Sequence, residues 1–376
     1  MNHHRDGAAQ HRIHKGQINY WPNRHGVGHP VPVKEGGYTE LVFNRVSYDQ
    51  ILMHTYRPMI PGSGTKQRLR GSKFQEHYNQ AQLFYNSLSP IEKLHLINAI
   101  SFELSHCDDK NVYEAYTRLL NNVDFELAKK VAQNVNGVVP DKPARENHGK
   151  SDPTLSQEFY FPKEPTIATR RIAVLIDDGF NLLELEAVRT ALASAKATTW
   201  VIGPRRGKVY ADGETVGSGQ FIVADHHFEG QRSTLFDAVY IPSGSHAKTL
   251  ASNGRAIHWI REAFGHCKAI GAVGEGAWKS LFFLLLFVEL FDPAVATVEC
   301  AIGLKEVQII RDLDSDDVVV SYGVVTTGKY NFQSAVVDIL SITSEPKGFV
   351  SNFACEISKH RCFDRELDGL VAKVAF

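Results

Sequence analysis

Three acidic residues follow the first strongly apolar stretch in the middle of the chain. Residues 172–176 are continuously apolar, as a strand buried on both faces requires. Asp177, Asp178 and Glu184 come soon after it. Because ligands of parallel α/β sheets bind outside the carboxyl ends of the strands, these carboxylates are candidate site residues. The alternative is ordinary structure, in which Asp177 and Asp178 form a turn with Gly179 and Glu184 lies on a solvated helix face.

A second candidate site lies in residues 269–276, where a strand, a sharp turn of small residues and a helix are predicted. This layout presents a nucleophile in α/β hydrolases. Here the tip of the turn is Gly274, which has no nucleophile. Cys267 precedes the strand, at the wrong end for a crevice, and is predicted to be a half-buried structural thiol. The basic stretch 205–208 could hold an anion or form a solvated surface loop.

Metal and nucleotide sites find little support in the sequence. His11 and His14 could offer two imidazoles to a metal, but no carboxylate or thiolate is suitably placed, so no metal site is predicted there. The glycines of residues 269–276 do not follow Gly-x-Gly-x-x-Gly, and no Walker loop is found. The 5 cysteines are scattered and include no Cys-x-x-Cys pair, which favours a reducing compartment over a disulfide framework.

Composition and charge exclude several classes of protein. With 43% hydrophobic and 22% charged residues, the 376-residue chain is typical of globular proteins and long enough for two or three domains. Its 41 basic and 42 acidic side chains leave a net charge of −1, so neither nucleic acid nor an anionic membrane is an expected partner. The longest apolar run, residues 281–291, is too short to cross a bilayer. No secretory signal or peroxisomal address is recognised, so a soluble, cytoplasmic protein is expected.

Helical periodicity and capping residues predict a small four-helix domain over residues 71–137. Apolar positions spaced by four and three mark the first helix within residues 73–88. A capping-box pattern with a proline begins the second helix after Ser89. The second helix is expected to end at residues 106–109, which can also cap the third. Asp124 is expected to cap the fourth helix, and Asn136 with Gly137 to supply the left-handed stop that follows.

The remaining segments flank that domain. Residues 1–70 show no sustained period and are predicted to form an irregular arm, and the proline-rich residues 138–169 a linker or wrapping segment. Residues 170–376 alternate apolar strand-like runs with helical stretches, which predicts a parallel, doubly wound α/β sheet. Strands are expected at residues 172–176, 198–202, 238–241, 269–273 and 318–320, and helices at 182–195 and 256–264.

Several stretches together resemble one family, the haem catalases. In the family's order they are residues 2–7 and 19–23 (end of the haem-barrel domain and start of the wrapping region), 80–90 and 102–106 (helical domain), and 200–207 and 224–238 (the extra C-terminal domain of large-subunit, particularly fungal, catalases). The resemblance implies disproportionation of hydrogen peroxide to water and oxygen, defence against oxidative stress, a haem cofactor and a homotetramer of catalase subunits.

The C-terminal domain is in turn similar to class I glutamine amidotransferases and their intracellular-protease-like relatives. In those proteins a cysteine at the elbow is assisted by a glutamate. Glu184 matches the position of the glutamate, whereas Gly274 occupies that of the cysteine. The resemblance therefore implies a flavodoxin-type α/β domain with an elbow that lacks its nucleophile.

The residues of a haem pocket are not found in the matching stretches. A haem catalase needs a distal histidine and asparagine above the ring and a tyrosinate below it. The family's tyrosine motif precedes the stretch that begins here at Asn2, and residues 45–49 neither match that motif nor precede that stretch. His3, His4 and His11 do not match the distal histidine. We therefore expect no catalytic, cofactor-binding or metal-binding residue in this chain, which would be inactive alone and contribute subunit packing and stability.

Two segments, roughly residues 41–64 and 277–306, have no counterpart in the family pattern. Retained non-coding sequence or a lineage-specific insertion would explain them, and an exposed apolar run at 281–291 would be an aggregation hazard. Two alternative functions are kept. One is a hydrolase or amidotransferase-like enzyme in which Cys267, or another group near Glu184, acts as the nucleophile, and the other is a chaperone-like module that binds through the apolar run.

Overall fold

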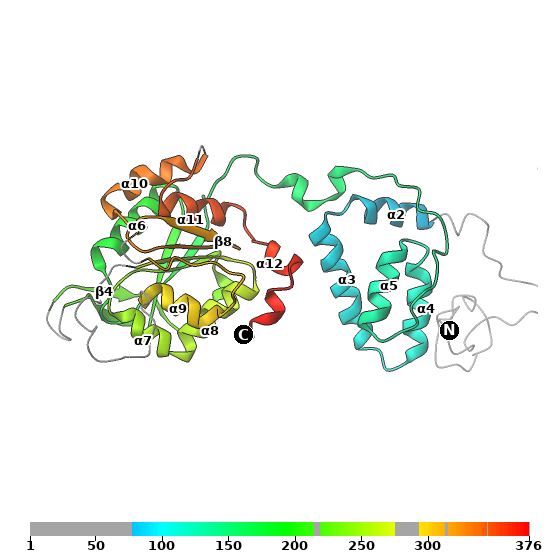
Figure 1. Cartoon of the computed structure of the whole chain (residues 1–376), viewed down its shortest axis with the longest axis horizontal. Coiled ribbons are helices and arrows are strands. Elements are labelled where there is room, and N and C mark those ends of the chain that lie inside the picture. The colour runs from blue at the N-terminus through cyan, green and yellow to red at the C-terminus, as the bar shows by residue number, and fades with distance from the viewer. Residues whose placement is uncertain (1–76, 214–218, 275–292, 313–314, 344, 376) are drawn as a thin grey trace, which may run out of the picture. The chain divides into compact units, whose positions relative to one another are not determined.

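A computed structural model describes residues 77–213, 219–274, 293–312, 315–343 and 345–375 (Figure 1). The chain divides into two compact units, residues 1–78 and 79–376, and nearly all described residues belong to the second. The predicted arm and the candidate histidines His11 and His14 lie outside the described residues. Among the described residues, no helix is long and apolar enough to span a membrane.

The predicted helical stretch forms four helices. They are α2 (His77–Ser87), α3 (Pro90–Ser105), α4 (Lys110–Leu120) and α5 (Phe125–Asn134). The capping box before α3 is present: the Glu92 amide donates to Ser89 Oγ at 3.4 Å, and the Ser89 amide donates to Glu92 Oε2 at 2.9 Å. Asn136 has a φ of 53° and ends the last helix in the left-handed conformation. The sequence therefore predicted these helix boundaries correctly.

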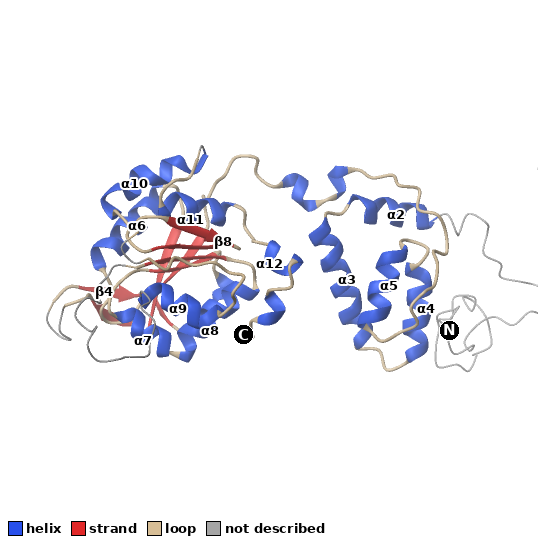
Figure 2. Ribbon diagram, in the orientation of Figure 1, coloured by secondary structure: helices blue, strands red, loops and turns tan. Residues whose placement is uncertain are grey.

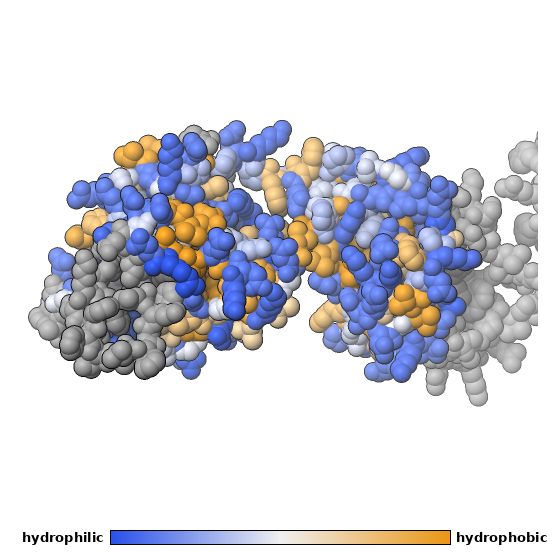
Figure 3. Space-filling model, in the orientation of Figure 1, coloured by the Kyte–Doolittle hydropathy of each residue, from blue (hydrophilic) through white to orange (hydrophobic). Residues whose placement is uncertain are grey.

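A compact apolar core joins these helices. The Asp109 and Asp124 carboxylates cap α4 and α5 by accepting hydrogen bonds from first-turn amides. The face of this helical part that Figure 3 shows is mainly hydrophilic, as expected for amphipathic helices packed on one core. The buried apolar side chains of this core are Tyr85, Ile97, Leu104, Leu120, Leu127, Ala128, Val131 and Val135.

The proline-rich segment after α5 wraps along α2. It contains only two short 3₁₀ turns, η2 (Pro153–Leu155) and η3 (Gln157–Tyr160). Asn86 Nδ2 of α2 donates to Asn147 Oδ1 at 2.8 Å, and Gln82 Nε2 donates to the Glu146 carbonyl at 3.3 Å. Side chains of one helix thus replace the backbone partners that this segment lacks.

The second half of the chain builds a seven-stranded sheet flanked by helices on both faces (Figure 2). The strand order is β5-β2-β1-β6-β7-β9-β8. All neighbours are parallel except β8 and β9, which pair antiparallel. The strands are β1 (Arg171–Leu175), β2 (Thr198–Gly203), β5 (His226–His227), β6 (Ala238–Ile241), β7 (Ala269–Val273), β8 (Val318–Ser321) and β9 (Val324–Thr327), with a separate hairpin of β3 (Gly207–Tyr210) and β4 (Phe221–Ala224).

Alternate residues of each strand enter different cores. In β1, Ile172 and Val174 belong to one buried cluster, and Ala173 and Leu175 to the other. The first cluster is completed by α6 (Leu182–Ser194), α10 (Ala335–Asp338) and α11 (Phe349–Ser358). The second is completed by α7 (His246–Ser252), α8 (Gly254–Gly265) and α9 (Pro293–Ile302). The shorter elements are α12 (Asp364–Leu367), η4 (Ser233–Leu235), η5 (Phe332–Ser334), η6 (Ile339–Thr343) and η7 (Val371–Lys373).

The predicted strands are all present, but one edge of the sheet differs from the prediction. Residues 318–320 were expected in a parallel sheet, whereas β8 runs antiparallel to β9. The cause is a two-residue turn at Tyr322 and Gly323, whose φ values of 49° and 72° are those of a hairpin turn. The sequence analysis missed β9 because Tyr-Gly is not one of the strong hairpin signals.

Part of the segment without a counterpart in the family contributes to the core. Val298 and Ala301 of α9 are buried, and Thr297 Oγ1 donates to the Ala247 carbonyl at 2.9 Å. The later part of residues 277–306 therefore does not behave as an exposed insertion. Residues 41–64 and the apolar run 281–291, on which the chaperone-like alternative depends, lie outside the described residues, so that alternative stays a prediction.

Candidate functional site

The candidate site lies at the carboxyl edge of the sheet, between β1 and β6. β2 and β6 flank β1 on opposite sides, so this is the point where the strand order reverses and where parallel α/β sheets bind ligands. The segments that follow β1 and β6 are joined there. The Asn181 amide donates to the Ser243 carbonyl at 2.8 Å, and the His246 amide to the Gly179 carbonyl at 3.2 Å.

Two glycines allow these segments to approach each other. Gly179 and Gly244 have φ values of 99° and 129°, a region that favours glycine. A Cβ on Gly244 would lie 2.4 Å from the Gly179 carbonyl oxygen. A side chain at Gly244 would therefore separate the two segments that form the candidate site.

Glu184 lies inside the site, although it belongs to the first turn of α6. Its amide donates to the capping Asn181 Oδ1 at 3.2 Å, and its side chain is only 1% exposed. The carboxylate accepts hydrogen bonds from the Tyr240 hydroxyl, the Ser243 hydroxyl and the Ser243 amide. The interpretation of Glu184 as a solvated helix residue is therefore wrong, and its role as a site residue stays a prediction.

Asp178 forms an ion pair that stabilises the loop after β1. Arg205 Nη2 donates to both Asp178 oxygens, at 2.7 and 2.9 Å, and the Tyr210 amide donates to Asp178 Oδ1 at 2.9 Å. Burial opposes ionisation, but these hydrogen bonds hold the pKa of Asp178 below its usual value. Arg205 is thus paired with Asp178, and Arg205, Arg206 and Lys208 are all exposed, so the prediction of a solvated surface loop for residues 205–208 is confirmed.

Asp177 and His246 occupy a drier part of the same edge. Burial raises the pKa of Asp177. The Asp177 amide donates to His246 Nδ1 at 3.2 Å, and His246 Nε2 donates to the Pro242 carbonyl at 2.9 Å. Burial also lowers the pKa of His246 to about 4, so the imidazole is neutral at physiological pH. Sequence reasoning missed His246, because the only sign of its burial is its place after β6.

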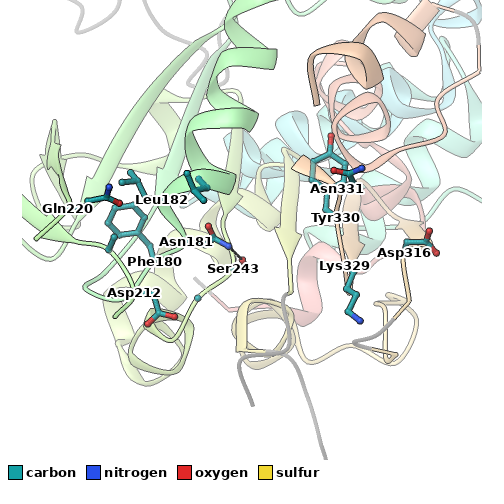
Figure 4. A pocket seen from close by; sticks show the side chains of 13 residues that line it. Phe180, Asn181, Leu182, Asp212, Gln220, Ser243, Asp316, Lys329, Tyr330 and Asn331 are labelled. Carbon is teal, nitrogen blue, oxygen red and sulfur yellow. Dashed lines mark hydrogen bonds between the residues drawn. The ribbon is translucent and has the colours of Figure 1, made fainter. Parts of the chain in front are cut away.

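A cavity of about 800 Å³ opens beside this network (Figure 4). Residues that follow β1 and residues of the β3–β4 hairpin lie across it from residues that follow β9. Its walls are mixed in polarity, and Ser243 contributes the hydroxyl that Glu184 binds. The lining residues are Phe180, Asn181, Leu182, Leu183, Ala211, Asp212, Gln220, Ser243, Gly244, Asp316, Lys329, Tyr330 and Asn331.

The elbow after β7 carries no nucleophilic side chain at its tip. Gly274 is buried at the end of β7, where its amide donates to the Thr327 carbonyl at 2.9 Å. Residues 275–292, which follow it, lie outside the described residues. The Glu184 carboxylate therefore assists no thiol at this position.

Cys267 lies at the opposite edge of the sheet, before β7. Its side chain is fully buried, more deeply than the half-buried thiol that was predicted, and its thiol donates to Glu366 Oε1 at 3.4 Å. Burial, with the nearby Glu366 carboxylate, raises the pKa of Cys267 to about 12. Cys267 therefore cannot act beside Glu184, because the two side chains belong to opposite edges of the sheet; a hydrolase that uses another group near Glu184 stays a prediction.

The cavity beside Glu184 does not offer a catalase-type ligand for haem iron. Iron ligation of the catalase type needs a tyrosinate. Tyr330 is the tyrosine that lines the cavity, but burial raises its pKa and its hydroxyl donates to Asp338 Oδ2 at 3.2 Å, so it stays a neutral phenol. Nor does the described part of the chain contain a group of three or more histidine, cysteine or carboxylate side chains that could hold a metal ion.

Comparison with known proteins gives consistent matches along the chain. Residues 71–135 match the family model "Catalase-related immune-responsive", and residues 168–283 match the "C-terminal domain found in long catalases". The chain is 42% identical over 381 residues to Catalase A of Aspergillus fumigatus and 42% identical over 377 residues to Catalase-1 of Neurospora crassa. It is 34% identical over 296 residues to Catalase-2 of Bacillus subtilis.

The alignments cover much more of this chain than of its relatives. All of this chain is covered by the alignment with the Aspergillus fumigatus protein, but only 46% of that protein is. The corresponding shares are 100% and 45% for the Neurospora crassa protein, and 78% and 38% for the Bacillus subtilis protein. The chain thus spans less than half the length of the curated relatives it matches.

Proposed function

Because the chain belongs to the long catalases of the fungal type, as a C-terminal portion, we propose that it supplies packing and stability to a catalase rather than peroxide chemistry of its own. The reaction of the whole enzyme would be the disproportionation of hydrogen peroxide to water and oxygen, in defence against oxidative stress. Its partners would be other catalase subunits in a homotetramer, with haem held by residues other than those described here. The expected location is the cytoplasm.

This proposal rests on two features of the carboxyl edge of the sheet, the hydrogen bonds of Glu184 and the residue at the elbow. Glu184 is the carboxylate at this edge that matches the glutamate of the amidotransferases in the sequence resemblance. Both of its oxygens accept hydrogen bonds, from Tyr240 and Ser243. The elbow position holds Gly274. We infer an amidotransferase-like domain in which the polar groups of the former site now stabilise the loops.

The first experiment tests inactivity. The purified full chain is titrated with haemin while absorbance is followed in the Soret region, and oxygen release from peroxide is measured with an electrode. We expect no stoichiometric Soret band and no more oxygen release than free haemin gives. Stoichiometric binding with rapid turnover would overturn the proposal. A Tyr330→Phe variant is the matched control, and it should behave as the unmodified chain does, because Tyr330 stays a neutral phenol bound to Asp338.

The second experiment tests the packing role. Sedimentation velocity of the full chain over a concentration series measures self-association. A chain that packs subunits together should associate reversibly through its own surfaces. A chain that stays monomeric at every concentration would contradict this role while leaving the haem result unaffected.

A further inference from the structure

Two cysteines far apart in sequence meet at the amino edge of the sheet. Cys267 lies between α8 and β7, and Cys362 lies between α11 and α12. The Cys362 amide donates to the Cys267 carbonyl at 2.7 Å. This bond brings the two backbones into direct contact, and a disulfide needs Cα atoms about 4.4 to 6.8 Å apart. Both thiols are free in this structure.

A buried guanidinium lies beside the Cys362 thiol. Arg365 is fully buried, and its Nη2 atom has no hydrogen-bond partner among the described residues. A Cβ built on Gly323 would lie 3.0 Å from Arg365 Nη2 and 3.3 Å from Cys362 Sγ, so both groups border the same small space. An unpaired buried donor is costly, and an anion formed on Cys362 would satisfy it.

The Cys267 thiol has its own proton acceptor. It donates to Glu366 Oε1 at 3.4 Å, and Glu366 follows Arg365 in α12. The two thiols also differ in access to solvent, because Cys267 is buried and Cys362 is partly exposed. A small oxidant therefore reaches Cys362 first, and Cys267 is placed to react second.

We propose that Cys267 and Cys362 are a peroxide-oxidised pair whose disulfide joins the C-terminal segment to the start of β7. This goes beyond the packing role proposed above and does not depend on it. The oxidant is hydrogen peroxide supplied in solution, and the product is an intramolecular cross-link between residues 95 positions apart.

The chemistry takes two balanced steps. The Cys362 thiolate, paired with Arg365, attacks a peroxide oxygen and breaks the O–O bond, giving a sulfenic acid and, with one proton, water. The Cys267 sulfur then attacks the sulfenic sulfur, forming the S–S bond, while hydroxide leaves as water with the proton of Cys267 passed through Glu366. Two thiols and one peroxide give one disulfide and two waters.

The test uses the purified full chain, reduced, freed of reductant and treated with a small molar excess of peroxide. Remaining thiols are alkylated and the disulfides are mapped by mass spectrometry of non-reduced peptides. We expect a cross-linked peptide pair containing Cys267 and Cys362, the loss of two thiols, and a rise in Tm that dithiothreitol reverses. Peroxide is assayed in parallel, so that catalytic peroxide loss, which would contradict the proposed function, is distinguished from failure to form the cross-link.

Three variants serve as controls. Cys362→Ser and Cys267→Ser should both lose the cross-link and the gain in Tm, and the exposed-thiol variant Cys300→Ser should behave as the unmodified chain does. A Cys355–Cys362 disulfide, an intermolecular disulfide, a sulfinic acid on Cys362 with Cys267 still free, or no thiol loss would each overturn the proposal.

The pH dependence gives a second test. Burial raises the pKa of both thiols, so only a small fraction is thiolate at neutral pH. The rate of cross-linking should therefore rise steadily with pH between about pH 7 and 9, because the thiolate fraction of Cys362 rises with it. A rate independent of pH in this range would contradict thiolate attack by this pair.

Discussion

The helical part and the α/β part of this molecule satisfy their polar groups in different ways. In the helices, the decisive contacts are local: Ser89 caps Glu92, and Asp124 caps Leu127, each across three residues. In the α/β part, Arg365 binds the carbonyls of Tyr322 and Phe264 across 43 and 101 residues. Glu184 reaches Tyr240 and Ser243 across 56 and 59 residues.

This difference has an energetic meaning. A local cap fixes one end of one helix, and its loss leaves one or two exposed backbone groups for water to satisfy. A buried long-range contact holds several elements in register, and its loss leaves polar groups that water cannot reach. We therefore expect substitutions in the α/β network to cost several times more stability than substitutions of caps in the helices.

The largest effect is expected at Arg365. Its guanidinium donates to the carbonyls of Tyr322, Phe264 and Lys268, and burial lowers its pKa only to about 10, so it stays charged at neutral pH. Arg365→Met should lower the free energy of unfolding by about 3 to 5 kcal/mol, because the buried carbonyls lose their donors. Urea unfolding measures the loss. Arg311→Met, which removes an exposed ion pair, should cost less than about 1 kcal/mol. Equal losses of unfolding free energy in the two variants would contradict the expectation that the buried arginine stabilises the fold more than the exposed one does.

The next effect is a dependence of stability on pH through His246. Burial lowers its pKa to about 4 in the folded chain, below the ordinary imidazole pKa of about 6.5, so the unfolded chain binds a proton more readily. Stability contributed by His246 is therefore complete above pH 6.5 and is lost as the pH falls from 6.5 to about 4, by about 3 kcal/mol in total. Urea unfolding across this range should show a weaker dependence in His246→Gln than in the unmodified chain. Parallel curves for His246→Gln and the unmodified chain would contradict the prediction.

Glu184 should show a smaller loss. Glu184→Gln keeps the shape of the side chain but replaces an acceptor with a donor facing Tyr240 and Ser243, which should cost about 1 to 2 kcal/mol in unfolding free energy. The exposed Glu186 of the same helix is the control, and Glu186→Gln should change stability by no more than about 0.5 kcal/mol. If the two variants behave alike, the buried network at the carboxyl edge does not stabilise the domain.

The smallest effect is expected at the cap of α3. Ser89→Ala should cost about 1 kcal/mol, whereas Ser89→Gly should cost only a few tenths. The measurement is again the free energy of urea unfolding. A loss from Ser89→Ala as large as that from Arg365→Met would show that local caps and long-range contacts do not differ in the way the structure indicates.

The sequence alone determined much of the architecture. The helices α3 to α5 begin where Ser89, Asp109 and Asp124 predicted, and the buried strands lie where continuous apolar runs predicted them. It also determined the absence of a nucleophile at Gly274. Each of these features depends on residues within a few positions of one another, so a short window of sequence contains the whole cause.

Only the tertiary structure decided the polar interior. The sequence left Glu184 open between a site residue and a surface helix residue, and it gave no signal for the burial of Arg365, His246 or Cys362. Folding brings the partners of Glu184 from 56 and 59 positions away and those of Arg365 from 43 to 101 positions away, and it places Cys362 beside Cys267. The physical reason is that burial and pairing of a charge depend on which strands become neighbours. That order is a property of the whole sheet, and no segment of the sequence specifies it alone.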